Sequence, residues 1–211
     1  MLPWSGKAGG SAPGDRVHAR IPAAATAPAF PGERVSEWLA RLFLYNRRMS
    51  EPSSIEGRLG ALLRTAGLTL ATAESCTGGR IADRITNIPG ASEYFLGGFV
   101  AYAYEAKVAE LGVSWDTLRG HGAVSKATVL EMARGARLAL GASLALAVTG
   151  IAGPGGGLAH KPVGTTWIGL ASETGEWARE FRFRGDRTTN KSSAADEGLQ
   201  LVLDFLERRL H

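Results

Sequence analysis

The residues best suited to chemistry lie in one short polar run, ESCTGG at residues 74–79. An apolar stretch, LTLATA at 68–73, precedes this run, and a helical pattern resumes at Arg80. A strand, a tight turn and a helix in that order expose the Ser75 hydroxyl at the rim of a sheet, where it can act as a nucleophile. The N–H groups that follow it can stabilise an oxyanion or hold a phosphate. A simpler interpretation is that Ser75 or Thr77 only caps the helix.

A serine nucleophile needs a base, and the histidines do not supply an obvious one. His121 and His160 stand alone in glycine-rich loops, and the other two histidines lie near the chain ends. A buried lysine whose pKa falls toward neutrality can accept the proton instead. Lys107 follows Tyr102 by five residues, where a strand gives way to a helix, and a tyrosine hydroxyl there can relay a proton or orient the nucleophile. By itself, the pattern fits a solvated surface lysine as well.

Cys76 is a second candidate nucleophile beside Ser75. A thiolate is favoured at a helix N-terminus, which is where the sequence places this residue. The two assignments predict opposite outcomes, because thiol alkylation would abolish turnover only if Cys76 attacks the substrate. We prefer Ser75.

A glycine-rich loop, TGIAGPGGG at 149–157, follows a buried apolar stretch, and KPVGT follows at 161–165. Its N–H groups suit an anionic nucleotide group, and Lys161 is placed to meet a phosphate. The loop matches neither the Walker P-loop nor the GxGxxG pattern. A purely structural turn is the alternative.

The elements that must position these residues alternate between strand and helix. Helices are expected at residues 55–66, 80–85, 107–111, 126–140 and 189–209, and strands at 68–73, 97–104, 143–149, 163–172 and 177–185, the last as an edge strand. This alternation predicts an α/β domain over residues 53–211, with a site at the carboxyl ends of the strands.

Charge and composition narrow the class of protein. Residues 49–211 hold 17 basic and 17 acidic residues, so the net charge of +4 comes from the first 48 residues, and no nucleic acid partner is expected. No apolar run is long enough for a membrane span. The single cysteine and the dispersed histidines predict no disulfide, no metal site and a cytoplasmic location.

The N-terminal 48 residues have a different composition. Five of the nine prolines fall within residues 1–31, without a sustained periodic pattern. We interpret residues 1–48 as a disordered tail or an over-extended reading frame, with spacing compatible with a short amphipathic helix at 35–47.

Together these segments resemble the CinA C-terminal domain family, which includes the stand-alone nicotinamide-nucleotide amidases. The resemblance runs in order over residues 54–210 through TLATAESCTGG (69–79), NIPGASEYFLGGFVAYAYEAK (87–107), GAVSKATVLEMARGA (122–136), LAVTGIAGPGGG (146–157) and KPVGTTWIGLA (161–171). It implies a three-layer α/β/α fold with a mixed sheet and association into a homo-oligomer, without a cofactor.

The reaction implied is hydrolysis of the carboxamide of nicotinamide mononucleotide, which yields nicotinate mononucleotide and ammonia. The resemblance implies Ser75 as nucleophile assisted by Lys107 and Tyr102, with Tyr104 in reserve, and the N–H groups near Thr77, Gly78 and Gly79 at the oxyanion. The residues expected at the substrate are Glu74, Thr77, Gly78, Gly79, Thr149, Gly150, Gly153, Lys161 and Arg187.

Two departures from the family accompany this resemblance. Larger members carry an additional N-terminal domain associated with pyrophosphatase activity, which residues 1–48 are too short to supply. The arginine that commonly follows GDR (185–187) by a few positions is replaced here by Asn190-Lys191. Two alternatives remain. The chain is a non-catalytic nucleotide- or partner-binding member of the same fold, or it is an amidase for another amide.

Overall fold

A five-stranded mixed sheet runs through the part of the chain that the computed structural model describes, residues 54–210. Its strands are Leu70–Glu74 (β1), Phe95–Val100 (β2), Leu144–Gly150 (β3), Thr165–Ser172 (β4) and Glu176–Arg182 (β5). The spatial order is β2-β1-β3-β4-β5. β1 is parallel to β2 and β3, whereas β4 is antiparallel to β3 and β5. The carboxyl ends of β1, β2 and β3 therefore share one edge of the sheet.

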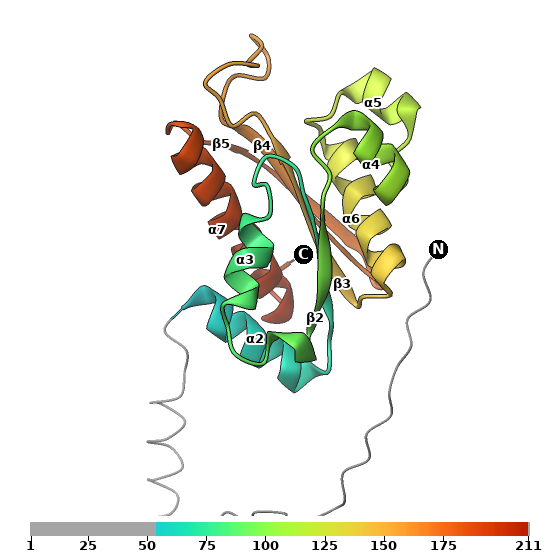
Figure 1. Cartoon of the computed structure of the whole chain (residues 1–211), viewed down its shortest axis with the longest axis vertical. Helices are drawn as coiled ribbons and strands as arrows, with labels where there is room; N and C mark the ends of the chain where they lie inside the picture. Colours follow the sequence, from blue (N-terminus) through green and yellow to red (C-terminus); the bar gives the residue numbers. More distant parts are fainter. Residues whose placement is uncertain (1–53, 211) are drawn as a thin grey trace, which may run out of the picture. The chain divides into compact units, whose positions relative to one another are not determined.

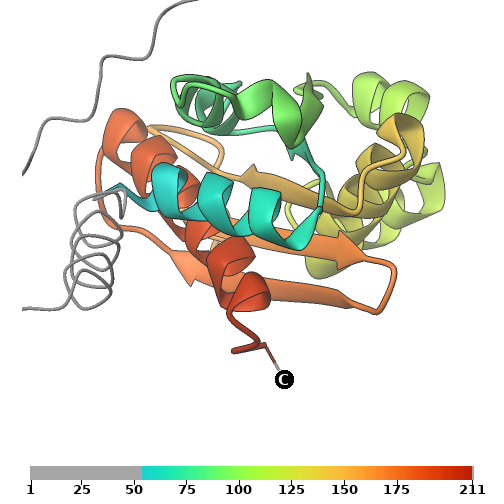
Figure 2. The same ribbon diagram turned by 90° about the horizontal axis from the view of Figure 1, so that it is seen from below.

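Helices cover both faces of this sheet and complete the three-layer fold (Figure 1, Figure 2). They are Ile55–Ala66 (α2), Arg80–Thr86 (α3), Tyr104–Leu111 (α4), Trp115–His121 (α5), Lys126–Leu140 (α6) and Arg187–Leu206 (α7), with a 3₁₀ turn at Ala91–Glu93. α2, α3 and α7 share one apolar cluster with the sheet, and α4, α5 and α6 share the other. The α/β/α expectation is confirmed.

β1 is an interior strand of the sheet, paired with β2 on one side and with β3 on the other. All five of its residues are buried, as expected for a parallel strand covered by helices on both faces. β5 at one edge has mostly half-buried or exposed residues and was predicted as an edge strand. The residue after β1 therefore follows a strand that is fully buried and paired on both sides.

Local signals set the helix ends where the sequence analysis placed them. The Ser54 hydroxyl accepts a hydrogen bond from the Gly57 N–H at 3.2 Å, and Gly67 ends α2 in the left-handed region at φ 63°. Ser125 caps α6 in the same way, and the inward stripe of α6 is buried at Val129, Met132, Ala133 and Ala136.

Several element bounds differ from the prediction by a few residues, and three differences bear on the site. The strand expected at 97–104 is β2 and ends at Val100, so Tyr102 follows the strand and Tyr104 opens α4. α5 was not predicted, although Ser114 caps it. α7 begins at Arg187, since the Asp186 side chain accepts from the Thr189 N–H.

The contact that seats α4 depends on a glycine. A Cβ on Gly135 in α6 would lie 1.9 Å from the Leu111 carbonyl oxygen at the end of α4. Only glycine lets the two helices approach this closely. The position of α4 matters because it carries Lys107.

The expected disordered tail at 1–48 and the helix at 35–47 lie outside the described residues. Within residues 54–210, no helix combines the length and apolar character needed to span a bilayer.

Candidate active site

Ser75 and Lys107 meet at the carboxyl edge of the sheet, 32 residues apart in sequence. The Lys107 Nζ lies 3.0 Å from the Ser75 Oγ. Both side chains are buried, with 8% of Ser75 and 1% of Lys107 exposed. The pair is therefore within proton-transfer distance and shielded from water.

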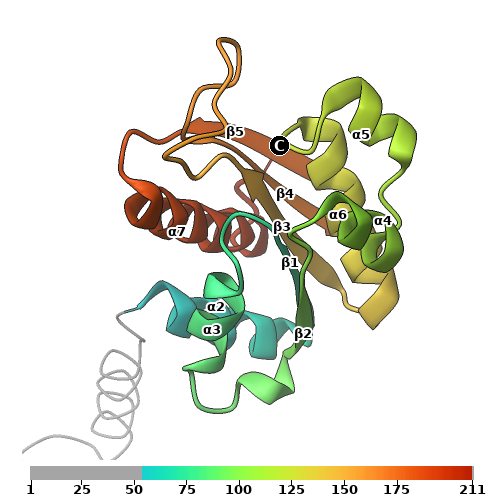
Figure 3. The ribbon, with the colours of Figure 1, turned by 45° about the horizontal axis from the view of Figure 1, so that its top comes forward.

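Backbone hydrogen bonds fix the two residues relative to the sheet. The Ser75 N–H donates to the Val148 carbonyl of β3 at 2.9 Å, and the Ala101 N–H donates to the Glu74 carbonyl at 2.9 Å. These bonds continue the pairing of β1 beyond its last residue on both sides. Figure 3 shows the loops that follow β1 and β3 and the start of α4 at this end of the sheet.

Burial shifts Lys107 toward its uncharged form. Burial lowers the pKa of Lys107 from 10.5 to about 8. Its Nζ also contacts the Ala101 carbonyl at 2.7 Å and the Tyr102 carbonyl at 3.1 Å. The Nζ donates to the Ser75 Oγ and to both carbonyls, as an ammonium does. Once the amine is uncharged, the two carbonyls can accept both of its hydrogens, which leaves its lone pair for the Ser75 hydroxyl. The geometry is that of a general base facing a nucleophile.

A cavity of about 340 Å³, here called the dyad cavity, opens onto this pair. Of the residues predicted to bind substrate, Thr149, Gly150, Lys161 and Arg187 line it. Lys161 and Arg187 bring two positive charges to a space that also contains two aromatic rings, Tyr102 and Tyr104. The cavity thus offers cations for an anionic group and apolar surface for a ring.

The cationic side chains of the dyad cavity are anchored by neighbouring groups. The Lys161 Nζ donates to the His121 carbonyl at 2.8 Å. Arg187 donates from one nitrogen to the Gly153 carbonyl at 2.7 Å and from another to the Tyr102 hydroxyl at 3.0 Å. Gly153, predicted at the substrate, contributes this carbonyl and does not line the cavity.

Lys107 was expected to take the Ser75 proton directly or through Tyr102, and the geometry offers the direct route. Tyr102 is 60% exposed, and its hydroxyl pairs with Arg187. Because Lys107 contacts Ser75 directly, no intermediate group is needed. Tyr102 contributes instead its backbone carbonyl to Lys107 and its ring to the wall of the cavity.

Glu74 was predicted at the substrate, and this prediction is wrong. Its side chain is 1% exposed, and its carboxylate accepts hydrogen bonds from the N–H groups of Gly79, Ile81 and Ala82 at 2.9, 3.1 and 2.9 Å. It therefore caps α3 from the end of β1 and holds the turn between them. The Gly79 N–H is used in this way and cannot face an oxyanion.

The other half of the turn faces a different space. Thr77, Gly78 and Gly79 line a second cavity between α3 and α7, called here the helix-side cavity, and do not line the dyad cavity. Within the described residues, the N–H groups of Cys76, Thr77 and Gly78 have no hydrogen-bond acceptor. Of these residues only Cys76 borders the dyad cavity.

Two further residues shape the site and were not predicted. Asn190 is buried, donates to the Ala152 carbonyl at 3.1 Å and accepts from the Gly185 N–H at 2.9 Å. It therefore ties the glycine loop after β3 to the start of α7. Ala123 accepts a hydrogen bond from the Thr149 hydroxyl at 2.8 Å. The only sequence signal for Asn190 was its departure from the family pattern.

The environment of Cys76 opposes its role as nucleophile. Burial raises the pKa of the Cys76 thiol to about 12. At neutral pH the reactive thiolate is therefore scarce, although the residue borders the dyad cavity. Among the described residues there is also no group of three or more side chains suited to a metal ion.

Comparison with known proteins gives a consistent result. Residues 52–206 match the sequence profile of the CinA C-terminal domain. A CinA-like protein of Chloroherpeton thalassium is 49% identical over 156 residues, and a putative competence-damage inducible protein of Desulforamulus reducens is 47% identical over 167 residues. The matches cover 72% and 79% of this chain but only 37% and 40% of those proteins.

Solved structures extend the similarity to the fold. The competence/damage inducible protein CihA from Agrobacterium tumefaciens is 42% identical, with a TM-score of 0.68, over 74% of this chain and 97% of that one. A CinA superfamily protein from Klebsiella pneumoniae is 33% identical, with a TM-score of 0.71, over 73% of this chain and 96% of that one.

Proposed function

The chain belongs to the CinA C-terminal domain family, and from that premise we propose that it is an amidohydrolase that converts nicotinamide mononucleotide to nicotinate mononucleotide and ammonia. Ser75 is the nucleophile and Lys107 is the base. The observation that carries the proposal is the 3.0 Å contact between the Lys107 Nζ and the Ser75 Oγ in a buried site.

The first half of the reaction forms an acyl-enzyme. With a pKa of about 8, roughly a tenth of the Lys107 side chains are uncharged at pH 7. The neutral amine takes the Ser75 proton while the Ser75 oxygen bonds to the carboxamide carbon. The Lys107 ammonium then gives that proton to the departing nitrogen, the C–N bond breaks and ammonia leaves.

The second half of the reaction consumes water. Lys107, again uncharged, takes a proton from a water molecule whose oxygen attacks the ester carbon. The bond to the Ser75 oxygen breaks, Ser75 regains a hydrogen from Lys107, and nicotinate mononucleotide leaves. The products account for all atoms of the amide and the water, and no cofactor is required.

Recognition of the mononucleotide rests on the cations of the dyad cavity. Lys161 and Arg187 supply positive charge for the phosphate, and the rings of Tyr102 and Tyr104 supply flat surface for the pyridine. Arg187 already shares a hydrogen bond with Tyr102, so one residue can couple phosphate binding to ring placement.

The test is ammonia release from nicotinamide mononucleotide by the wild type and by Ser75→Ala. We expect release by the wild type and a loss of at least about 10³-fold in kcat for the variant. Ser92→Ala, at an exposed serine in the 3₁₀ turn, is the matched control and should keep wild-type turnover. If the wild type releases no ammonia, or if Ser75→Ala retains full activity, the proposal fails.

Substrate comparison sharpens the assignment. Nicotinamide, its riboside and its mononucleotide differ only by a ribose and a phosphate, so their relative kcat/KM values measure recognition of each part. We expect the mononucleotide to be preferred by at least about tenfold over the riboside, the size of one charge-assisted interaction. Equal kcat/KM values would show that the phosphate is not recognised, and the protein would then be an amidase for another amide.

A further inference from the structure

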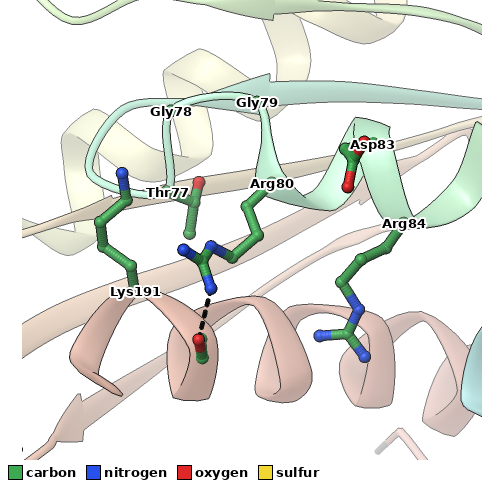
Figure 4. Close-up of a pocket in the computed structure, with 8 residues that line it drawn as sticks. Thr77, Gly78, Gly79, Arg80, Asp83, Arg84 and Lys191 are labelled. Atoms are coloured by element: carbon green, nitrogen blue, oxygen red, sulfur yellow. Dashed lines mark hydrogen bonds between the residues drawn. The ribbon is translucent and has the colours of Figure 1, made fainter. Parts of the chain in front are cut away.

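The helix-side cavity has a volume of about 540 Å³ and lies between α3 and α7 (Figure 4). It shares no lining residue with the dyad cavity. Its upper wall is the turn at Thr77–Gly79, the continuation of the segment that carries Ser75. The mechanism proposed above makes no use of this space.

Two cations face the cavity without an acidic partner among the described residues. Lys191 extends from α7 toward the turn, and its Nζ lies 3.5 Å from where a Cβ on Gly78 would be. The structure gives this ammonium no hydrogen-bond acceptor within residues 54–210. Arg80 donates a hydrogen bond to the Ser192 hydroxyl, a neutral group that leaves the guanidinium charge uncompensated.

The remaining charged residues of the cavity do not cancel this positive charge. Arg84 is paired with Glu56 and Asp196, each at 2.6 Å, so it contributes little net charge. Asp83 is the one carboxylate that lines the cavity, and it is exposed. Against it stand Arg80 and Lys191, which leaves the cavity with a net positive charge.

One hydroxyl without a partner accompanies the two cations. Thr77, which lines the cavity, is 1% exposed, and its Oγ1 is buried without a hydrogen-bond partner in the described chain. The Ser192 hydroxyl accepts from Arg80 and already donates to the Thr188 carbonyl at 3.1 Å. Glu74 occupies the N–H groups of Gly79, Ile81 and Ala82, whereas those of Thr77 and Gly78 have no acceptor within the described residues. An anion in the cavity would therefore be held chiefly by Arg80 and Lys191.

We propose that the helix-side cavity binds a phosphate monoester, separately from the substrate in the dyad cavity. An arginine and a lysine that can both contact one bound group match the three oxygens and double charge of a phosphate better than the two oxygens and single charge of a planar carboxylate. The volume exceeds that of the phosphate itself, so the cavity has room for part of the molecule that bears it.

The test measures binding of inorganic phosphate by titration calorimetry, at constant ionic strength against chloride. We expect saturable binding by the wild type and affinity about tenfold weaker in Lys191→Ala, the loss of one charge-assisted contact. Lys191→Arg should restore most of the affinity. Lys191 is half-exposed, so its truncation should leave the melting temperature near that of the wild type.

Two lysine variants act as controls for location. Lys126→Ala removes an exposed charge at the start of α6, and Lys161→Ala removes a cation of the dyad cavity. Lys126→Ala should bind phosphate as the wild type does, and Lys161→Ala should keep the binding that Lys191→Ala loses. The proposal fails if the wild type binds no phosphate. It also fails if Lys161→Ala loses phosphate binding while Lys191→Ala keeps it, because the phosphate would then lie in the dyad cavity. The test measures phosphate binding and not ammonia release. The phosphate site and the proposed amidase activity can therefore be contradicted independently of each other.

Discussion

The dyad cavity and the helix-side cavity lie along the same turn, yet their lysines have opposite environments. Lys107 is 1% exposed, and its Nζ touches only a hydroxyl and two carbonyls. Lys191 is half-exposed at the rim of an open cavity. The first amine has lost its water without gaining a counter-ion, whereas the second keeps access to water.

This difference shows how burial decides what an amine can do. Desolvation disfavours the ammonium form and so suits Lys107 to the proposed role of a base, whereas a solvated lysine suits the proposed role of an electrostatic ligand. Neither role follows from residue type. The four predictions below test the contrast, beginning with the change expected to have the largest effect.

Lys107→Met should abolish turnover while keeping the chain folded. Methionine fills a similar volume without a proton acceptor, and loss of a general base typically costs 10²-fold to 10⁴-fold, so we expect kcat to fall by about 10³-fold. Lys107→Arg should be equally inactive, because a guanidinium stays protonated. Steady-state ammonia release measures both variants. Lys191→Met, which changes the half-exposed lysine of the helix-side cavity, should lower kcat by less than about threefold. If its kcat fell as much as that of Lys107→Met, the two lysines would not differ in role.

The pH dependence of kcat/KM should report the pKa of Lys107. Since its pKa is lowered to about 8, the active, uncharged form is scarce below that pH and dominant above it. We therefore expect kcat/KM to rise about tenfold per pH unit below pH 8 and to level off above it. Measurements should stay above about pH 6.5, where the substrate phosphate is already ionised. A profile that is flat or falls between pH 7 and 9 would contradict an uncharged lysine base.

Glu74→Gln should loosen the turn that separates the two cavities. The Glu74 carboxylate accepts from three N–H groups, and the glutamine amide nitrogen would replace one acceptor with a donor. We expect about 2 kcal/mol lower stability by denaturant titration and a several-fold lower kcat with little change in KM. Glu93→Gln, at an exposed site, is the control. Unchanged stability would show that the cap is not needed.

The sequence allowed much of the fold to be predicted because its signals are local. Ser54, Ser125 and Gly67 mark helix ends that the structure confirms, and the apolar run of β1 identified a buried strand. The end of β2 was misjudged because residues 101–104 keep an alternating apolar pattern after the pairing stops. Periodicity reports side-chain polarity, whereas a strand ends where its backbone partners end.

The site was less predictable because it depends on which atoms face which. The proximity of Ser75 and Lys107 follows from parallel pairing of β1 with β2, which brings the segments after both strands to one edge. Glu74 was misassigned because alternation along a strand cannot reveal that a carboxylate turns back to cap α3. The hydroxyl of Tyr102 likewise points to Arg187, a partner 85 residues away.

Cys76→Ala should have the smallest effect on kcat of the four predictions. It tests the effect of burial on an acid, the thiol, where Lys107 tests it on an amine. The same desolvation that frees the lone pair of Lys107 keeps the thiol of Cys76 protonated, with a pKa raised to about 12. We expect kcat within about threefold of the wild type, and alkylation by iodoacetamide at pH 7.5 much slower than that of free cysteine. Mass spectrometry of the alkylated chain gives the rate, and its urea-unfolded form is the control that should react fully. Rapid alkylation of the folded protein with parallel loss of ammonia release would mean that the Cys76 thiolate is present. Burial would then not keep the Cys76 thiol protonated at this edge of the sheet.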